Sequence, residues 1–484
     1  MDGNPFGMKY DPRMTARFAC VFCLGAAAML AATPSSLSTT APVDPVPQSN
    51  QVSVTMPFTP QAQRIAIPAF VVPPGDPELA TAAKTVADVL WNDIDFEEEF
   101  QLVSRDATTT VPPAATIESI PFDRWAALGA EYVMFARVQR DTGGFSVAVQ
   151  LVAVSGPTAK QHGYGQKFSP CTIRNPRSCA HFISDSMHRE IRHLTGVAQT
   201  KIAFTSDRGN QKMSNRPIEN PGSAKEIYIA DYDGANQQPI TNNQSLNLAP
   251  AWAPDGRTLA YVSYVATFSD IYLRNIYETT PPARPAGGSA DVQSSLPAWS
   301  PDGTKIAFAS DRKGGTDIWV MNRDGSDLRQ LTHSNNMMGV ANTSPTWSPT
   351  GAQIAFVSDR SGSRQIYVMA ADGTGVTVLT NDPSADRPSW APAPFNDIAY
   401  TSTRKGGGFD IAIIDVGSRQ VRVMTDGTAD NEQPVFASTG RHIAFVTTRF
   451  GGKPQIAILD RKGAIQCQVT KDGANTYPNW SRAK

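Results

Sequence analysis

The stretch that decides the fold runs from Trp299 to Thr332 and reads WSPDGTKIAFASDRKGGTDIWVMNRDGSDLRQLT. Short alternating segments in it are separated by two Asp-Gly pairs. Such pairs indicate hairpin turns, because glycine takes positive φ without steric cost. We therefore predict four short strands, one containing Trp299 and the others at Ile306–Ser310, Asp317–Met321 and Leu328–Thr332.

The same unit recurs through the C-terminal part of the chain. A Pro-x-aromatic motif occurs six times, 43 to 48 residues apart, with its aromatic residue at Trp252, Trp299, Trp347, Trp390, Phe436 and Trp480. An apolar-Ala-aromatic motif also occurs six times, as in IAF at Ile306 and Ile354. Four-stranded repeats of this length are typical of β-propeller blades.

The ends of the repeat array predict how the ring closes. The first copy starts at Lys201 with no Pro-x-aromatic strand before it, and the last copy stops at Trp480. The C-terminal strand can therefore supply the strand missing from the first blade, which removes an exposed sheet edge. We predict a mainly β fold, with a six-bladed propeller closed by the C-terminal strand.

The residues before the propeller divide into three parts. Basic residues followed by the apolar run Phe18–Ala32 are typical of a secretory signal peptide, predicted over 1–32. Residues 33–63 are rich in Pro, Ser and Thr and read as a flexible arm. From 64 to 198, strand and helix patterns alternate, which predicts a small α/β domain before the propeller at 199–484. Its last helix carries an apolar stripe and is expected to end at Gly196.

Composition and cysteine usage limit the functional classes. The chain has 43 basic and 44 acidic residues, and this balance argues against a nucleic-acid-binding protein. Cys171 and Cys179 flank a turn-like Asn-Pro pair, so in an oxidising compartment they can pair. Two free thiols are the alternative, and Cys467 is expected to be a small buried residue.

The sequence offers no convincing catalytic or cofactor site. Neither Gly-x-Ser-x-Gly nor His-Glu-x-x-His occurs. His188 and His193 fall on different helix faces, so we expect them in solvent. Asp231–Gly234 resembles the start of a calcium loop but lacks the distal glutamate, which favours a turn. Ser-Asp-Arg recurs at 206, 310 and 358 and is interpreted as a loop-stabilising motif. We therefore predict no enzyme activity, no cofactor and no metal.

The unrepeated residues before each Pro-x-aromatic motif are the candidate binding site. If this strand is the innermost of each blade, these segments surround one mouth of the central channel and suit a loop or peptide of a partner. A hydrated mouth without a ligand is the alternative. The candidate residues are Asn247, Gln293, Ser294, Ser295, Leu296, Asn342, Thr343, Ser344, Asp386, Arg387, Asn431, Glu432, Asn475 and Thr476.

Export signal, small α/β domain and six such repeats together resemble the TolB family of the periplasmic Tol-Pal system. The segment FDRWAALGAEYVMFARVQR and the junction AHFISDSMHREIRHLTG before KIAFTSDR are also similar to the family. The resemblance implies a non-enzymatic periplasmic scaffold that supports outer-membrane integrity and cell division. It implies that a Pal-like peptidoglycan-associated lipoprotein binds at the channel mouth, near Gln293–Leu296 and Asn342–Ser344.

The resemblance also implies communication with a TolA-like inner-membrane protein through the mature N-terminus. The protein would then be peripheral to the membrane through partners only. This chain departs from the family in the residues of the mouth, in its long arm before Arg64 and in the Cys171–Cys179 loop. Two alternatives stay open: an exported propeller hydrolase or peptidase, and a peptidoglycan- or carbohydrate-binding protein.

Overall fold

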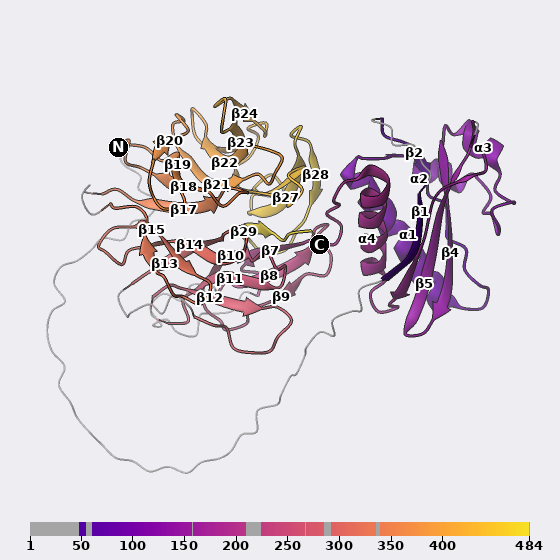
Figure 1. Ribbon diagram of the computed structural model, residues 1–484, viewed down its shortest axis with the longest axis horizontal. Helices are drawn as coiled ribbons and strands as arrows, with labels where there is room; N and C mark the ends of the chain where they lie inside the picture. The colour runs from indigo at the N-terminus through magenta and orange to yellow at the C-terminus, as the bar shows by residue number, and fades with distance from the viewer. Residues whose placement is uncertain are drawn as a thin grey trace, which may run out of the picture. The chain divides into compact units, whose positions relative to one another are not determined.

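The structure, a computed structural model, describes residues 48–54, 61–156, 158–209, 224–266, 268–284, 292–334 and 339–483, with 48–54 as backbone only. The predicted signal peptide at 1–32 lies outside the described residues. Figure 1 shows the blades of a propeller and a separate α/β part earlier in the chain. No helix among the described residues is long and apolar enough to cross a membrane.

The α/β domain is built on a six-stranded sheet of order β1-β6-β5-β4-β2-β3. Its strands are β1 (Gln48–Val54), β2 (Arg64–Ala66), β3 (Gln101–Leu102), β4 (Tyr132–Asp141), β5 (Gly144–Ala153) and β6 (His162–Cys171). Its helices are α1 (Pro77–Glu97), α2 (Arg105–Thr109), α3 (Phe122–Ala127), α4 (Pro176–Met187) and the π-helical turn η1 (His188–Arg192).

Alternation along the strands gives this sheet two apolar faces. In β4, Met134 and Ala136 belong to the core that includes α1 and α4. Val133 and Phe135 belong to a second core with Trp125 of α3. Asp76 caps the N-terminus of α1, since its carboxylate accepts a hydrogen bond from the Leu79 N–H at 2.9 Å.

Two parts of the predicted domain are corrected by the structure. The prediction of an arm over 33–63 is wrong for Gln48–Val54, because this backbone pairs antiparallel with β6 as an edge strand. Polar composition concealed it, since an edge strand needs backbone partners more than apolar side chains. Helix α4 and its π turn end at Arg192, because His193 takes a left-handed φ of 55°, so Gly196 does not end the helix.

Cys171, at the end of β6, and Cys179, in α4, form a disulfide. This bond joins the sheet to the first turns of α4 on the inner core of the domain. Cys467 is half-buried and packs against the core of the closing blade instead of being fully enclosed.

The propeller has six blades, and each begins at the centre with a Pro-x-aromatic strand. Among the described residues, five blades have four strands and one has three. The first three blades in chain order are β29 (Asn475–Trp480), β7 (Lys201–Ser206), β8 (Glu226–Asp231) and β9 (Gln238–Pro239); β10 (Asn247–Trp252), β11 (Thr258–Ser263) and β12 (Asp270–Asn275); β13 (Ser294–Trp299), β14 (Lys305–Ser310), β15 (Asp317–Asn322) and β16 (Arg329–Gln330).

The remaining three blades all have four strands. They are β17 (Asn342–Trp347), β18 (Gln353–Ser358), β19 (Gln365–Ala370) and β20 (Thr377–Val378); β21 (Ala385–Trp390), β22 (Asp397–Thr403), β23 (Phe409–Asp415) and β24 (Val421–Val423); β25 (Asn431–Phe436), β26 (His442–Thr447), β27 (Gln455–Asp460) and β28 (Ile465–Gln468). The quoted stretch is confirmed as one blade.

Tryptophans of the inner strands hold neighbouring blades together. Trp299 packs with Ile306 and Phe308 of its own blade and with Ala260 and Ile271 of the preceding blade. Its indole N–H donates to the Ala251 carbonyl of the preceding inner strand at 3.1 Å. Trp347 repeats this bond, donating to the Ala298 carbonyl at 3.2 Å, so at these two blade boundaries apolar burial is joined to one directional bond.

The ring closes through β29, as the sequence predicts. Strand β29 pairs antiparallel with β7, with Asn475 opposite Ser206 and Trp480 opposite Ile202. The Trp480 indole N–H donates to the Thr200 hydroxyl at 2.7 Å. The first and last segments of the propeller thus form one sheet.

Replacing Trp480 with alanine should lower the free energy of unfolding by about 3–5 kcal/mol, because it leaves a cavity in the closing blade. Trp480 is 6% exposed, whereas Tyr277 is 39% exposed. The matched substitution Tyr277→Ala should therefore change stability by less than about 1 kcal/mol. Urea unfolding followed by fluorescence measures both, and equal effects would argue against closure through β29.

Candidate functional site: the central channel

The six inner strands surround a central channel with a volume of about 810 Å³. Its wall contains the Pro-x-aromatic segments of all six blades, together with residues 193–195 and 482–483. Thr195 accepts a hydrogen bond from Arg441 at 2.7 Å, beside the turn that follows β25. Residues 193–195 therefore lie at the mouth where the inner strands end, and the opposite mouth is formed where they begin.

Every inner strand has a β-bulge at its third residue. The pairing register shifts there in all six blades. The residue at each bulge has a φ between 49° and 55° and directly precedes proline. All six bulge residues line the channel, and we call them the bulge ring: Ala249, Leu296, Ser344, Arg387, Gln433 and Tyr477.

The bulge ring combines a repeated backbone with unrepeated side chains. Left-handed backbone is unfavourable for residues other than glycine, so its sixfold recurrence requires support from the surrounding fold. A bulge also leaves one residue out of the regular ladder and re-aims its side chain. The ring is therefore a device that points six different side chains into the channel.

The first residue of each inner strand has a different role. Five candidate residues at this position were expected to bind a partner, and the structure corrects this expectation because each side chain is 0% exposed. They are Asn247, Ser294, Asn342, Asn431 and Asn475. The Asn342 amide, for example, donates to Asp317 of the preceding blade at 2.9 Å and accepts from Arg360 at 2.8 Å. The four asparagines therefore connect blades, and none of the five side chains is accessible to a partner.

The Ser-Asp-Arg motif, in the loop after the second strand of a blade, forms hydrogen bonds that hold the start of the inner strand in place. Asp359 accepts a hydrogen bond from the backbone N–H of Ala341, just before β17, at 2.8 Å. Arg360 stacks over Phe356 and Tyr367, with its guanidinium carbon 5.5 and 5.0 Å from their ring centroids. The motif thus has the loop-stabilising role expected from its repetition.

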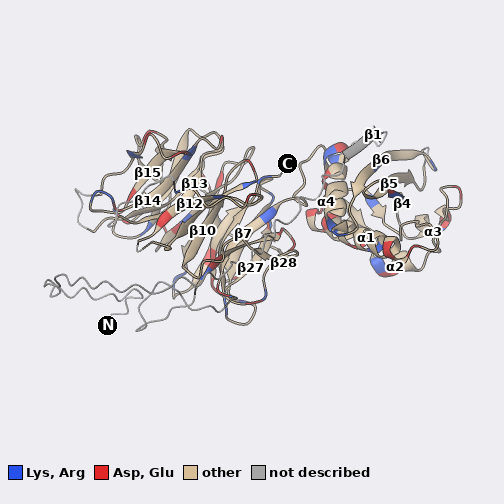
Figure 2. Ribbon diagram, turned by 90° about the horizontal axis from the view of Figure 1, so that it is seen from below, with Lys and Arg blue, Asp and Glu red and all other residues tan. Residues whose placement is uncertain are grey.

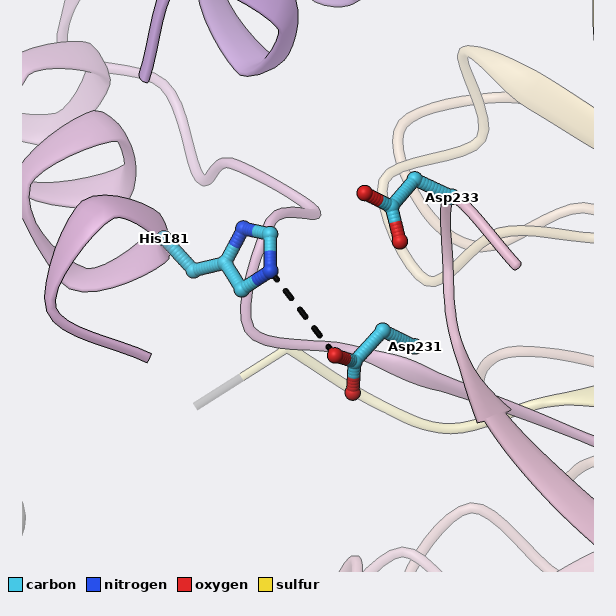
Figure 3. A group of neighbouring side chains, drawn as sticks. All are labelled: His181, Asp231 and Asp233. Atoms are coloured by element: carbon cyan, nitrogen blue, oxygen red, sulfur yellow. Dashed lines mark ion pairs between the residues drawn. The ribbon is translucent and has the colours of Figure 1, made fainter. Parts of the chain in front are cut away.

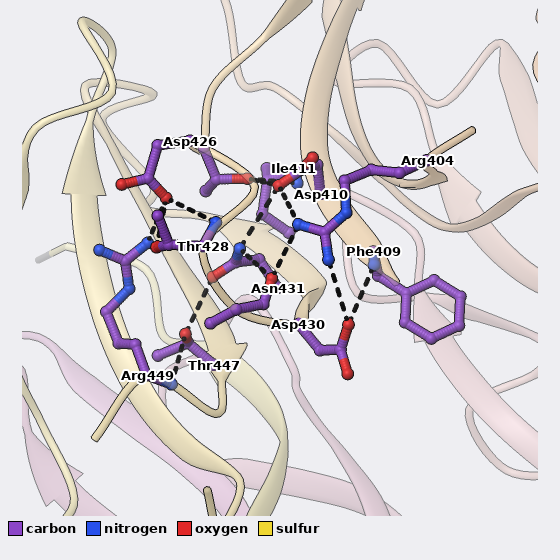
Figure 4. A network of polar contacts seen from close by, with 12 residues as sticks. Arg404, Phe409, Asp410, Ile411, Asp426, Thr428, Asp430, Asn431, Thr447 and Arg449 are labelled. Atoms are coloured by element: carbon purple, nitrogen blue, oxygen red, sulfur yellow. Dashed lines mark hydrogen bonds and ion pairs between the residues drawn. The ribbon is translucent and has the colours of Figure 1, made fainter. Parts of the chain in front are cut away.

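Two blades keep the arginine but lose the aspartate. In Figure 4, Arg449 pairs with Asp426 at 3.1 Å and Arg404 reaches toward Asp430 at 3.5 Å. The hydroxyl of Thr447 donates to Asn431, which in turn contacts Asp410. The arginine therefore finds a carboxylate on another loop, and the strand-start residue stays buried.

The other candidate residues lie at or near the strand-start mouth. Leu296, Ser344 and Arg387 belong to the bulge ring and line the channel. Gln293 is exposed, and five more are half-buried: Ser295, Thr343, Asp386, Glu432 and Thr476. Ala249, Gln433 and Tyr477 line the channel but are not among the candidate residues predicted from the sequence. Their signal was available, since each directly precedes the repeated proline.

A polar bridge crosses this mouth between three blades. The Arg387 guanidinium lies 4.7 Å from the centroid of the Tyr477 ring, and it donates to the Tyr477 hydroxyl at 3.2 Å. The Gln433 side-chain carbonyl, on the blade between them, accepts from the Tyr477 N–H at 2.6 Å. Arg387 and Tyr477 thus form a preorganised polar pair within the bulge ring.

The charge of the channel is one-sided. Arg387, Arg441 and Arg482 line it, whereas no aspartate or glutamate does so among the described residues. Glu432 lies beside the mouth, where burial and the neighbouring Asp430 raise its pKa. A wall of prolines, aromatics, hydroxyls and arginines suits binding.

A second polar region joins α1 and α4 to the propeller. Glu97 of α1 is 5% exposed and accepts from Arg441 at 2.6 Å and from the Val197 N–H at 2.7 Å. Asp185 of α4 accepts from the N–H groups of Ala198 and Gln199 at 2.9 and 3.0 Å. These carboxylates fix the connecting segment that leads into β7.

His188 corrects another sequence expectation. It is 0% exposed, its Nδ1 lies 2.8 Å from the Ser184 carbonyl, and its ring meets Phe100 edge-on. The expectation of solvent exposure is wrong because the π-helical turn rotates the chain after Met187. His193 is exposed, as expected.

Two family models match this chain. One, described as TolB beta propeller domain, covers residues 189–484, and the other, TolB amino-terminal domain, covers residues 51–159. The chain belongs to the TolB family. The predicted limits of the α/β domain, 64 and 198, remain an expectation.

Relatives named Tol-Pal system protein TolB share part of the chain. The one from Desulfosudis oleivorans is 29% identical over 289 residues, which is 59% of this chain and 61% of the relative. The one from Alkalilimnicola ehrlichii is 31% identical over 217 residues, 44% of this chain and 47% of the relative. The matches therefore span less than two thirds of these relatives' own length.

A solved structure shares the fold over most of the chain. The crystal structure of TolB from Acinetobacter baumannii has a TM-score of 0.70 at 22% identity, and the match covers 89% of this chain and 99% of that one. The likeness supports the TolB architecture of an α/β domain followed by a propeller.

Removing one arginine of the Ser-Asp-Arg motif should destabilise the propeller. Arg360→Ala loses the stack on two aromatic rings and the bond to Asn342, with an expected cost of about 2 kcal/mol. Lys313, an exposed cation in the same loop of the neighbouring blade, provides the control as Lys313→Ala. Urea denaturation measures both, and a cost below about 0.5 kcal/mol for Arg360→Ala would contradict this role.

Asp185 should make stability depend on pH. Burial raises its pKa to about 6, despite the hydrogen bonds from Gln199 and Ala198. In the unfolded chain the value is about 3.9. The native state therefore holds the proton more tightly, and this stability is present at low pH and lost as pH rises through 6. From pH 7 to pH 5, wild type should gain about 1 kcal/mol relative to Asp185→Asn.

Urea unfolding of both proteins at pH 5, 6 and 7 measures this difference. The Asp185→Asn variant cannot titrate at this position but keeps all the other titratable groups. The difference in stability between the two proteins therefore reports the titration of Asp185 alone. Parallel pH profiles for the two proteins would contradict the assignment.

Proposed function

We propose that this protein is a non-enzymatic periplasmic scaffold of the Tol-Pal system. In this proposal the strand-start mouth of the channel binds a Pal-like peptidoglycan-associated lipoprotein. Membership of the TolB family and relatives named for the Tol-Pal system support the system. The observation that carries the binding site is the bulge ring, which aims six unrepeated side chains into one channel.

The physical character of the mouth favours a protein partner. Its backbone is preorganised by the buried strand-start residues and the Ser-Asp-Arg contacts, so little ordering is needed on binding. Arg387 and Tyr477 are the residue types that most often dominate binding energy at interfaces. A loop or short segment that enters the channel would meet both residues together with Leu296 and Gln433.

The proposal includes a TolA-like inner-membrane partner, reached through the N-terminal part of the chain. It includes roles in outer-membrane integrity and cell division, and association with membranes through partners only. Backbone pairing of Gln48–Val54 with β6 shows one way in which N-terminal segments add to the α/β domain. Strand addition of this kind is a common mode of peptide recognition.

Arg387→Ala should weaken lipoprotein binding about tenfold or more, because it removes the cationic half of the polar bridge. The measurement is calorimetric titration of the purified protein with the soluble domain of a Pal-like lipoprotein from the same organism. Tyr477→Ala should act in the same direction. The control Arg329→Ala removes an exposed arginine from outer strand β16 and should leave the affinity unchanged.

Different outcomes separate the alternatives. Unchanged affinity in both channel variants would move the binding site away from the bulge ring. Binding to isolated peptidoglycan without any lipoprotein would favour the carbohydrate-binding alternative. Turnover of chromogenic peptides or esters would overturn the non-enzymatic assignment.

A further inference from the structure

One buried histidine presents an unused nitrogen to two aspartates. His181 of α4 places Nδ1 2.8 Å from the carboxylate of Asp93, and that carboxylate also accepts from the Tyr232 hydroxyl at 2.7 Å. Asp93 is 1% exposed, so it is held in a fixed position. A carboxylate at Nδ1 keeps the proton on that nitrogen and leaves the lone pair of Nε2 available.

The second nitrogen of His181 is unsatisfied within the described part of the chain. His181 is 4% exposed, and its Nε2 has no hydrogen-bond partner. Asp231 Oδ2 is 3.9 Å away, which is too long for a hydrogen bond. Figure 3 shows His181 facing Asp231, with Asp233 beside them, and ligand atoms of the three residues lie within 4.8 Å of one another.

We propose that His181 Nε2 and the carboxylates of Asp231 and Asp233 form a binding site for a divalent transition cation, best matched by zinc. One imidazole and two carboxylates are donors that zinc accepts, with water as a fourth ligand. Ligands at usual zinc distances and a tetrahedral angle lie about 3.4 Å apart. The observed gap of 3.9 Å needs only a small adjustment to reach this value.

The carboxylate behind the histidine strengthens this assignment. Ligating histidines commonly donate their other N–H to a carboxylate, which fixes the ring and raises its basicity. Burial lowers the pKa of His181, but Asp93, Asp231 and Asp233 outweigh it and raise the pKa. The pocket thus favours a positive charge on Nε2, and a proton is the natural competitor of a metal ion.

Neighbouring groups define what zinc must displace. Lys201 binds Asp231 Oδ1 at 2.7 Å, and Asn236 donates to Asp231 Oδ2 at the same distance. Arg177 pairs with Asp233. The side chains of Arg177 and Asp233 are 25% and 24% exposed, so the arginine can move into solvent and open a path to the site. Lys201 can remain on its own oxygen.

Such an ion would be a structural link. His181 lies in α4, whereas Asp231 ends β8 and Asp233 follows in the turn after it. Zinc on all three would join the α/β domain to the closing blade. The site is separate from the channel lining, so it is independent of the proposed partner-binding function.

The test is calorimetric titration with zinc sulfate of the purified protein, prepared without a histidine tag and treated with EDTA. We expect one zinc per chain, an affinity that increases from pH 6 to pH 7.5, and a rise in Tm with zinc but not with magnesium. His181→Gln and Asp233→Asn should each weaken zinc binding at least tenfold. His333→Gln, which changes an exposed loop histidine, should bind zinc as wild type does.

Several results would overturn the proposal. One such result is the absence of zinc binding by wild type at about 100 µM, a concentration that fills sites of moderate affinity. Equal zinc binding by wild type and the two site variants would place the ion elsewhere. An NMR titration in which His181 stays protonated at pH 7.5 with zinc present would show an imidazolium ion pair. His181→Gln changes a buried side chain and can destabilise the protein. Asp233→Asn changes a partly exposed side chain, so this variant should keep the fold, which circular dichroism checks.

Discussion

Antiparallel pairing between β29 and β7 is the constraint on which the propeller depends. It joins segments more than 250 residues apart in the chain and leaves no blade as an open end. Once the ring is closed, each inner strand has a neighbour on both sides, and each tryptophan wedge has a blade to pack against. The buried strand-start residues can then bind across successive blades. The channel, with its fixed mouth, is a consequence of this closure.

The sequence predicted the fold well because the blades repeat. Six copies of two short motifs identify inner and second strands, and the unmatched ends of the array identify the closing strand. Elements without a repeat or a strong apolar pattern were harder to find. Strand β6 (His162–Cys171) contains two glycines and a proline, and it was not predicted. Strand β1 is an edge strand in a polar stretch, where backbone hydrogen bonding alone decides the structure.

The sequence predicted where the candidate site lies, but it could not distinguish the residues of the mouth that are accessible from those that are buried. Position in the repeat located the mouth, but Asn342 and Thr343 look equally available in a sequence although one is buried and the other is half-exposed. Only the left-handed bulge reveals that the third residue faces the channel. His181 and Asp231 lie 50 residues apart in different domains, so no spacing rule could bring them together. In Figure 2, both signs of charge are spread over the blades and helices, in agreement with the balanced composition.

The position of β29 in the chain has a consequence for how the protein is made. The inner strand of the first blade is synthesised after the strands of the other five blades. Until it arrives, β7 has an unpaired edge, and a growing chain must keep that edge away from other strands. A product that ends before Asn475 would keep all its other blade motifs yet remain open. The ring can therefore close only after the segment Asn475–Trp480 has been synthesised, so the pairing that completes the first blade also closes the ring.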